Sequence, residues 1–155
     1  MTTWITDPSE IPPGAGAYGL GILLQASVDL KTMQFRGQTL TPGLYLYAGS
    51  ANGPGGLKSR VSRHLRADKK PHWHVDQLTG SGQVIFAALI PGGQECELVD
   101  LALKLGAETP VRGFGSSDCR RCAAHLLRLD EGFEVDRLGA GVVLSVPVHR
   151  HARTL

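Results

Sequence analysis

Short apolar runs alternate with longer amphipathic ones along the chain, and the change of period predicts where strands and helices lie. Apolar runs of about four to eight residues bounded by glycine or proline are typical of buried strands. Such runs occupy residues 18–26, 33–40, 44–48, 83–90 and 142–148. Gly19 and Gly21 interrupt the first run, which indicates that another group approaches its backbone closely.

Apolar residues at helical spacing predict helices between these strands. Leu57, Val61 and Leu65 predict a helix over residues 57–67, and a second apolar stripe predicts one over residues 94–105. Trp73, Val75 and Leu78 predict a short helix or turn in between. A third helix is expected from an N-cap at Ser117 or Asp118 to about Arg128.

These elements predict a single α+β domain with a small central antiparallel β-sheet flanked by helices. The connections between the first three strands are short, which favours antiparallel pairing. A length of 155 residues suits one domain. We expect a flexible N-terminal lead-in over residues 1–13, which carries three prolines, then the domain over 14–148 and a basic tail over 149–155.

The composition is typical of a soluble protein. Charged residues make up 19% of the chain, and no apolar run approaches the roughly 20 residues that span a bilayer. The N-terminus lacks the pattern of a secretory signal. We therefore expect a cytoplasmic protein that does not enter a membrane.

Positive charge is concentrated in one short window, although the net charge is only +2. The window contains Lys58, Arg60, Arg63, Arg66, Lys69 and Lys70. One interpretation is an ordinary solvated helix face. The other is a local patch that binds the phosphates of a nucleic acid, whatever the global charge.

A helical wheel divides this window. Arg60 and His64 flank the apolar stripe, where the helix should meet the sheet, whereas Arg63 and Arg66 should point to solvent. An arginine at such a boundary either extends over the edge of the core or serves a site. We favour a site for Arg60 and His64.

The helix over residues 94–105 places a carboxylate on its inward face. Glu95 falls within the arc of Leu98, Val99 and Ala102, while Glu97 lies opposite. An inward carboxylate costs free energy unless it is paired or binds metal. Either Glu95 favours the helix dipole from the first turn, or it binds a hard divalent ion such as Mg²⁺ or Mn²⁺.

An ordered series of residues resembles a known family. The series is Gly16-Ala-Tyr18, Tyr47-Ala-Gly49, Arg60, His64, a histidine at 72 or 74, and Glu95. It resembles the GIY-YIG nuclease superfamily. The longer pattern, which includes Lys-x-His-Trp-His-x-Asp, Glu-Cys-Glu and Gly-Phe-Gly-Ser-Ser-Asp-Cys, resembles its Uri-type endonuclease-related branch over residues of about 14 to 148.

The resemblance implies metal-dependent hydrolysis of a phosphodiester bond, one DNA strand per site. Tyr18 and Tyr47 would line the site, Arg60 would stabilise charge on the phosphate, and His64 would act as an acid–base or positioning group. Glu95 would hold Mg²⁺ or Mn²⁺. The remaining expected substrate-binding positions are Gly49, Lys58, Arg63, Lys69, Lys70, His72 and His74.

The sequence departs from the superfamily in one position and leaves two other functions open. An asparagine usual after the glutamate helix is absent beyond Pro110, and Ser116, Ser117 or Asp118 would have to replace it. A nucleic-acid-binding module without catalysis would keep the basic helix but needs no inward carboxylate. A zinc-stabilised interaction domain is the third function. DNA is the expected partner ahead of RNA, and the sequence does not indicate whether a protein partner or a homodimer forms.

The hypothesis of a zinc site rests on cysteine and histidine residues. Cys119, Cys122 and His125 are spaced three apart on the expected third helix, and Cys96 adjoins Glu95. Zinc accepts such a Cys₃His set. The alternatives are buried reduced cysteines, or a role for Asp118 and His125 in the nuclease site.

The segment His72-Trp-His74-Val-Asp76 admits three interpretations. Trp73 packs in the core, or it stacks on a base, or His74 and Asp76 bind a metal.

Overall fold

The computed structural model describes residues 2–66, 75–115 and 121–147. Its main element is a six-stranded sheet of order β1-β8-β6-β2-β5-β7. The strands are β1 (Thr3–Ile5), β2 (Gly16–Leu24), β5 (Gly43–Ala51), β6 (Gln83–Pro91), β7 (Leu126–Leu129) and β8 (Val142–Ser145). β1 pairs with β8 in parallel and every other pair in this sheet is antiparallel. The predicted α+β fold with a central antiparallel sheet is confirmed.

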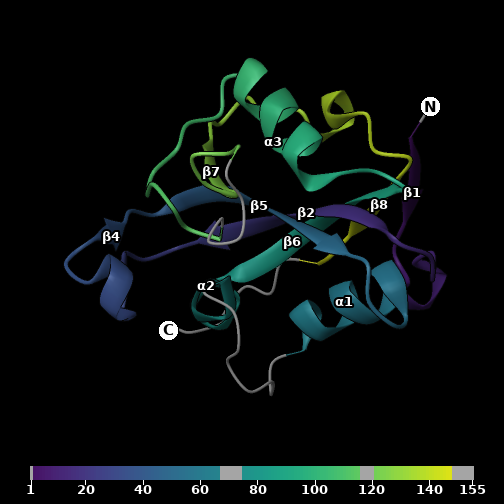
Figure 1. Cartoon of the computed structure of the whole chain (residues 1–155), viewed down its shortest axis with the longest axis horizontal. Helices are drawn as coiled ribbons and strands as arrows, with labels where there is room; N and C mark the ends of the chain where they lie inside the picture. The colour runs from purple at the N-terminus through teal and green to yellow at the C-terminus, as the bar shows by residue number, and fades with distance from the viewer. Residues whose placement is uncertain (1, 67–74, 116–120, 148–155) are drawn as a thin grey trace.

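Helices cover both faces of this sheet, as Figure 1 shows. α1 (Gly56–Leu65) and α2 (Val75–Ser81) pack on one face, and α3 (Glu95–Lys104) packs on the other. Side chains of β5 alternate between the two cores: Tyr47 joins the α1 face, and Ala48 joins the α3 face. The predicted helices over 57–67 and 94–105 are thus confirmed, each slightly shorter than expected.

The strands predicted over residues 18–26, 44–48 and 83–90 form the centre of the sheet. Gly19 and Gly21 of β2 have the close neighbours that their positions indicated. A Cβ at Gly19 would lie 3.1 Å from Leu98 Cδ2 of α3, and one at Gly21 would meet the ring of Phe86. Glycine in this strand therefore lets α3 and β6 pack against it.

The strand predicted over residues 33–40 is wrong. A short 3₁₀ helix occupies Met33–Phe35, and only β4 (Thr39–Leu40) is extended, in a hairpin with β3 (Val28–Asp29). Phe35, an apolar residue of this run, is buried against Phe114, with ring centroids 5.3 Å apart. Consequently β2 pairs directly with β5.

A third helix was predicted to reach Arg128. That prediction is wrong over residues 121–128, where the structure has no helix. Residues 121–125 are irregular, and β7 follows as an edge strand on β5. Leu126 and Leu127 are buried in opposite cores, as alternate residues of a strand must be. A second 3₁₀ helix, Val135–Leu138, precedes β8.

The N-terminal segment, which the sequence predicted to be a flexible lead-in, contains two short elements of regular structure. β1 extends the sheet, and a 3₁₀ helix follows at Pro8–Glu10. The carbonyls of Pro12 and Gly14 accept hydrogen bonds from the amides of Lys58 and Leu57, at 3.1 and 2.9 Å. These bonds satisfy the first turn of α1, whose N-cap Gly55 offers no side-chain cap.

Two further predictions concern the C-terminal tail and membrane-spanning segments. The basic tail over 149–155 lies outside them. Within them, no helix is both long and apolar enough to cross a lipid bilayer.

Candidate functional site

Four elements from distant parts of the chain converge on one place. β2 contributes Tyr18, β5 contributes Tyr47, α1 contributes Arg60 and His64, and α3 contributes Glu95. The rings of Tyr18 and Tyr47 are 6.5 Å apart, and that of His64 is 5.4 and 6.2 Å from them. The structure thus brings three of the five residues expected to be catalytic into contact, and Arg60 and Glu95 lie close enough to act electrostatically on both tyrosines.

A buried hydrogen bond joins β2 to α1 within the site. Tyr18 Oη lies 2.8 Å from His64 Nε2, and both side chains are buried. The other ring nitrogen of His64, Nδ1, lies 4.0 Å from Asp76 Oδ1 of α2. A carboxylate on that side favours a proton on Nδ1, so that Nε2 accepts the Tyr18 hydroxyl proton.

Gly49, one of the expected substrate-binding positions, lies against the phenol of Tyr18. Tyr18 and Gly49 are paired across β2 and β5, and a Cβ at Gly49 would lie 2.4 Å from Tyr18 Oη. Glycine at this position makes room for the phenol of Tyr18.

Both phenols are held in the protonated form at neutral pH. Burial raises the pKa of Tyr18 well above its ordinary range, and the nearby Tyr47 and Glu95 add to this. Burial, followed by the charge of Glu95, raises the pKa of Tyr47 to about 12. The Arg60 guanidinium opposes both shifts by stabilising a phenolate.

Arg60 lies at the rim of the site, half-buried, as the helical wheel predicted. It donates a hydrogen bond to the Ser50 carbonyl at 3.3 Å, and a side-chain hydrogen bond to Tyr18 contributes to its effect on that pKa. Its charge acts on both tyrosines. A group that opposes the pKa shift of two buried phenols is placed to stabilise negative charge formed beside them.

Glu95 lies in the first turn of α3 and is partly exposed, with 29% of its side chain accessible. Its charge acts on both tyrosines, so the carboxylate lies within electrostatic range of them, whereas Glu97 is exposed. A single accessible carboxylate fits a hard divalent ion that takes its other ligands from water and phosphate. Of the two carboxylates, Glu95 is the one whose charge acts on the tyrosines, so an ion held there would lie near the phenols.

Arg63 does not point freely to solvent, and that prediction is wrong. It forms a bidentate pair with Asp76, both Nη–Oδ distances being 3.0 Å, and the Asp76 carboxylate is 1% exposed. Asp76 was considered only as a metal ligand together with His74. Arg63 and Asp76 belong to different helices, so no local pattern in the sequence predicts that they pair. Asp76 instead links Arg63 to the His64–Tyr18 hydrogen bond.

Cysteine and histidine side chains gather beside Glu95 on the α3 face. Ligand atoms of Cys96, Cys122 and His125 all lie within 4.8 Å of one another. His125 Nδ1 lies 3.5 Å from Glu95 Oε2. The geometry differs from the predicted one, because Cys122 and His125 come from the irregular segment before β7 rather than from a helix.

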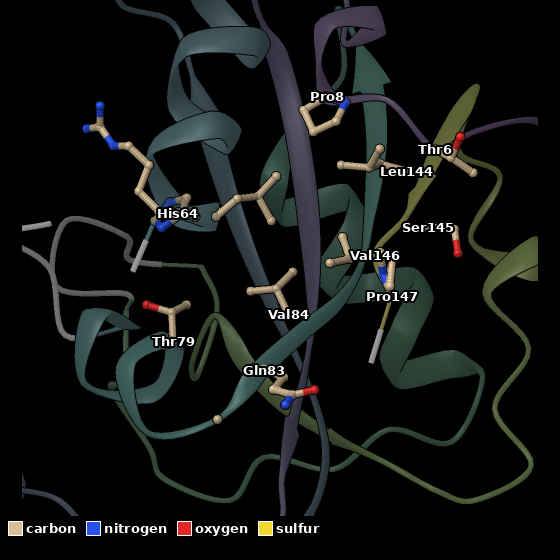
Figure 2. Close-up of a pocket in the computed structure, with 13 residues that line it drawn as sticks. Thr6, Pro8, His64, Thr79, Gln83, Val84, Leu144, Ser145, Val146 and Pro147 are labelled. Carbon is tan, nitrogen blue, oxygen red and sulfur yellow. The ribbon is translucent and has the colours of Figure 1, made fainter. Parts of the chain in front are cut away.

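Among the hollows on the described surface, two adjoin α1, and they differ in the chemistry of their lining. A pocket of about 420 Å³ lies between the helices and β6 and β8, with His64 on one side and Leu144 and Ser145 on the other (Figure 2). Tyr18, Tyr47 and Arg60 are not among the described residues that line it. Its lining is mostly apolar, which does not suit a polyanion.

The second hollow is basic and has a volume of about 490 Å³. Its cationic lining residues all come from α1 and the residue after it: Lys58, Arg60, Arg63 and Arg66. Lys58 and Arg66 are exposed there. We call this surface the basic hollow. Because Arg60 belongs to both, the basic hollow adjoins the tyrosine site.

Several expected site residues lie outside the described residues. These are the proposed substrate-binding positions Lys69, Lys70, His72 and His74, the cysteine Cys119, and the asparagine substitutes Ser116, Ser117 and Asp118. Trp73 also lies there, so its role as core or base-stacking residue stays a prediction.

Comparison with known proteins gives one match. Residues 17–144 match a family described as a domain of unknown function, DUF123. Curated proteins and solved structures give no match. The matched region runs from β2 to β8 and includes all five residues of the site together with the cysteine and histidine cluster. Since it covers most of the chain, the protein belongs to the DUF123 family.

Proposed function

We propose that this protein is a metal-dependent endonuclease of the GIY-YIG superfamily, from its Uri-type branch, which cuts one strand of DNA at a time. One observation carries the proposal: the five residues that the resemblance names converge from β2, β5, α1 and α3. A module that only binds phosphate has no need for a carboxylate and two buried phenols beside an arginine.

The charges of the site support hydrolysis of a phosphodiester. Arg60 would bind the scissile phosphate and stabilise the charge that develops on it. Glu95 would hold the divalent ion, which when bound polarises the phosphate and stabilises the leaving oxygen. The other side chains act on water and protons.

The tyrosines and His64 would accept and transfer the proton that the attacking water releases. As both phenols are protonated at neutral pH, Tyr47 is placed to donate a hydrogen bond to a phosphate oxygen or to water. Tyr18 Oη would take up the proton that the attacking water releases, while its own proton passes to His64 Nε2 across 2.8 Å. Asp76, 4.0 Å from His64 Nδ1, would stabilise the imidazolium that results.

The basic hollow supports nucleic acid as the substrate. Clustered cations attract the phosphate backbone without reading its sequence. Lys58 and Arg66 are exposed there, and Arg60 connects the hollow to the tyrosines. Substrate phosphates on either side of the cut bond would lie along α1.

The test is nicking of supercoiled plasmid by purified protein with Mg²⁺ or Mn²⁺. We expect conversion to open circles that requires the metal and is suppressed by chelator. Glu95→Gln and Arg60→Ala should each lose most of this activity, at least about 100-fold for a lost charge-stabilising group. Glu97→Gln is the matched control, because its carboxylate lies on the same helix but is exposed.

Binding measured beside cleavage separates the alternatives. Wild-type protein that binds DNA by fluorescence anisotropy but cuts neither DNA nor RNA with any divalent metal would be a binding module without catalysis. Equal activity of wild type and Glu95→Gln at unchanged folding would contradict the role of the carboxylate. Thermal unfolding of each variant shows whether lost activity reflects lost structure.

A further inference from the structure

We propose that Cys96, Cys122 and His125 bind a structural zinc ion, which fixes α3 to the segment before β7 and thereby holds Glu95 beside the tyrosines. The proposal does not depend on nuclease activity. It concerns residues that the hydrolytic mechanism does not use.

The first support is the donor set. Two cysteine sulfurs and one imidazole, with their ligand atoms within 4.8 Å of one another, are soft and borderline ligands that suit Zn²⁺ in tetrahedral coordination. Hard ions such as Mg²⁺ prefer oxygen. The cluster and the Glu95 site thus select different metals. The fourth zinc position can be taken by a water molecule.

The second support is a buried nitrogen. His125 is 2% exposed, and its Nε2 has no hydrogen-bond partner among the described residues. A buried polar atom without a partner costs free energy, so such atoms are rare in folded proteins. A zinc–nitrogen bond at Nε2 satisfies this atom.

The third support is the carboxylate on the other side of the same ring. His125 Nδ1 lies 3.5 Å from Glu95 Oε2. Histidine ligands of zinc commonly donate their second N–H to a carboxylate, which fixes the tautomer and the ring orientation. With Nδ1 facing Glu95, Nε2 is the nitrogen left for the metal.

The backbone holds the histidine in place independently of the ion. The His125 amide donates to the Phe114 carbonyl at 2.9 Å, and its carbonyl accepts from the Ala48 amide at 2.8 Å. Cys96 lies in the first turn of α3, directly after Glu95. A metal bond between these two segments therefore limits how far the Glu95 carboxylate can move from the sheet.

The test measures metal content without nucleic acid. Protein is produced with zinc in the medium, purified under reducing conditions without chelator, and analysed by mass spectrometry of the metal. We expect one zinc ion per chain. Cys96→Ser, Cys122→Ser and His125→Asn should each lose it, and removal of the ion from wild type should lower the midpoint of thermal unfolding.

Substitution of Glu95 should weaken zinc binding without abolishing it, and Glu97 provides the matched control. Glu95→Ala should keep the three ligands but weaken zinc binding about 10- to 100-fold in competition with a coloured chelator. Glu97→Ala, one residue beyond Cys96 and exposed, should leave the affinity unchanged. Equal affinities of the two variants would overturn the contact between Glu95 and the metal-binding histidine.

Substitution of cobalt for zinc tests the site in the wild-type protein, so the result does not depend on whether a variant folds. Co²⁺ added to metal-free wild type should give the thiolate charge-transfer and d–d bands of a tetrahedral site. Wild type that retains no zinc and shows no thiolate band with Co²⁺ would overturn the proposal. So would cysteine variants that keep full zinc. Zinc without nicking contradicts only the nuclease, and nicking without zinc contradicts only the zinc site.

Discussion

Tyr18 lies opposite Gly49 in the pairing of β2 with β5, and its phenol occupies the space that any side chain at Gly49 would need. A Cβ there would be 2.4 Å from both Cζ and Oη of Tyr18. The relationship explains why one strand supplies a tyrosine where its partner supplies glycine. It also fixes the hydroxyl at hydrogen-bonding distance from His64.

Gly49→Ala should therefore displace Tyr18 and break its hydrogen bond to His64. Forcing a methyl group into a filled core costs about 1–3 kcal/mol, so the free energy of unfolding should fall by that amount. Urea unfolding measures it, and plasmid nicking should fall as well. Gly53→Ala is the control, since nothing lies within 4 Å of its added Cβ. The packing argument fails if the two variants are equally stable.

The Arg63–Asp76 pair should contribute much more to stability than an exposed pair. Arg63→Ala leaves the 1%-exposed Asp76 carboxylate without its bidentate partner, which should cost about 3–5 kcal/mol. Arg121 and Asp100 form a comparable pair at the surface, where Arg121→Ala should cost about 0–1 kcal/mol. Denaturant unfolding of both variants tests the contrast. A similar small loss in each would mean that Asp76 is hydrated in solution.

Stability should fall at alkaline pH because of the buried phenols. The pKa of Tyr47 is raised from an ordinary 10.0 to about 12 in the folded state. Its stabilising contribution is therefore complete below pH 10 and is lost as the pH rises through about 12, because the unfolded chain then releases its proton more readily. A shift of this size corresponds to about 2–3 kcal/mol.

Tyr47→Phe isolates that contribution. The free energy of unfolding, measured from pH 8 upwards, should decline less steeply above pH 10 in the variant than in wild type. Identical slopes would show that the phenol of Tyr47 titrates normally. The comparison removes the contributions of Tyr18 and of other groups, which both proteins share.

Lys58 should bind DNA through phosphate alone. Lys58→Ala removes an exposed cation from the basic hollow, so binding should weaken equally for all sequences. The slope of log affinity against log salt should decrease by about one. Lys104→Ala, on α3 at the opposite face of the sheet, is the control. An equal effect of both variants in anisotropy titrations would show that binding is not located on α1.

Local patterns in the sequence determined the central strands, α1 and α3. Their apolar residues repeat with one clear period, because each element buries one stripe or a whole run against the same core. The same periodicity placed Arg60 and His64 at the boundary of α1 with the sheet and Glu95 on the inner side of α3. Both placements agree with their burial in the structure.

Pairing over long distances decided what the patterns could not. β1 and β7 are only three and four residues long, and each is a strand because a neighbouring strand offers it hydrogen bonds. The pairing of Arg63 with Asp76 also depends on a distant partner, because Asp76 lies on another helix. The sequence by itself determined which side of each element carries chemistry. Only the tertiary structure decided which side chains meet, because a contact between Tyr18 and Gly49, or between Glu95 and His125, depends on how separate elements pack.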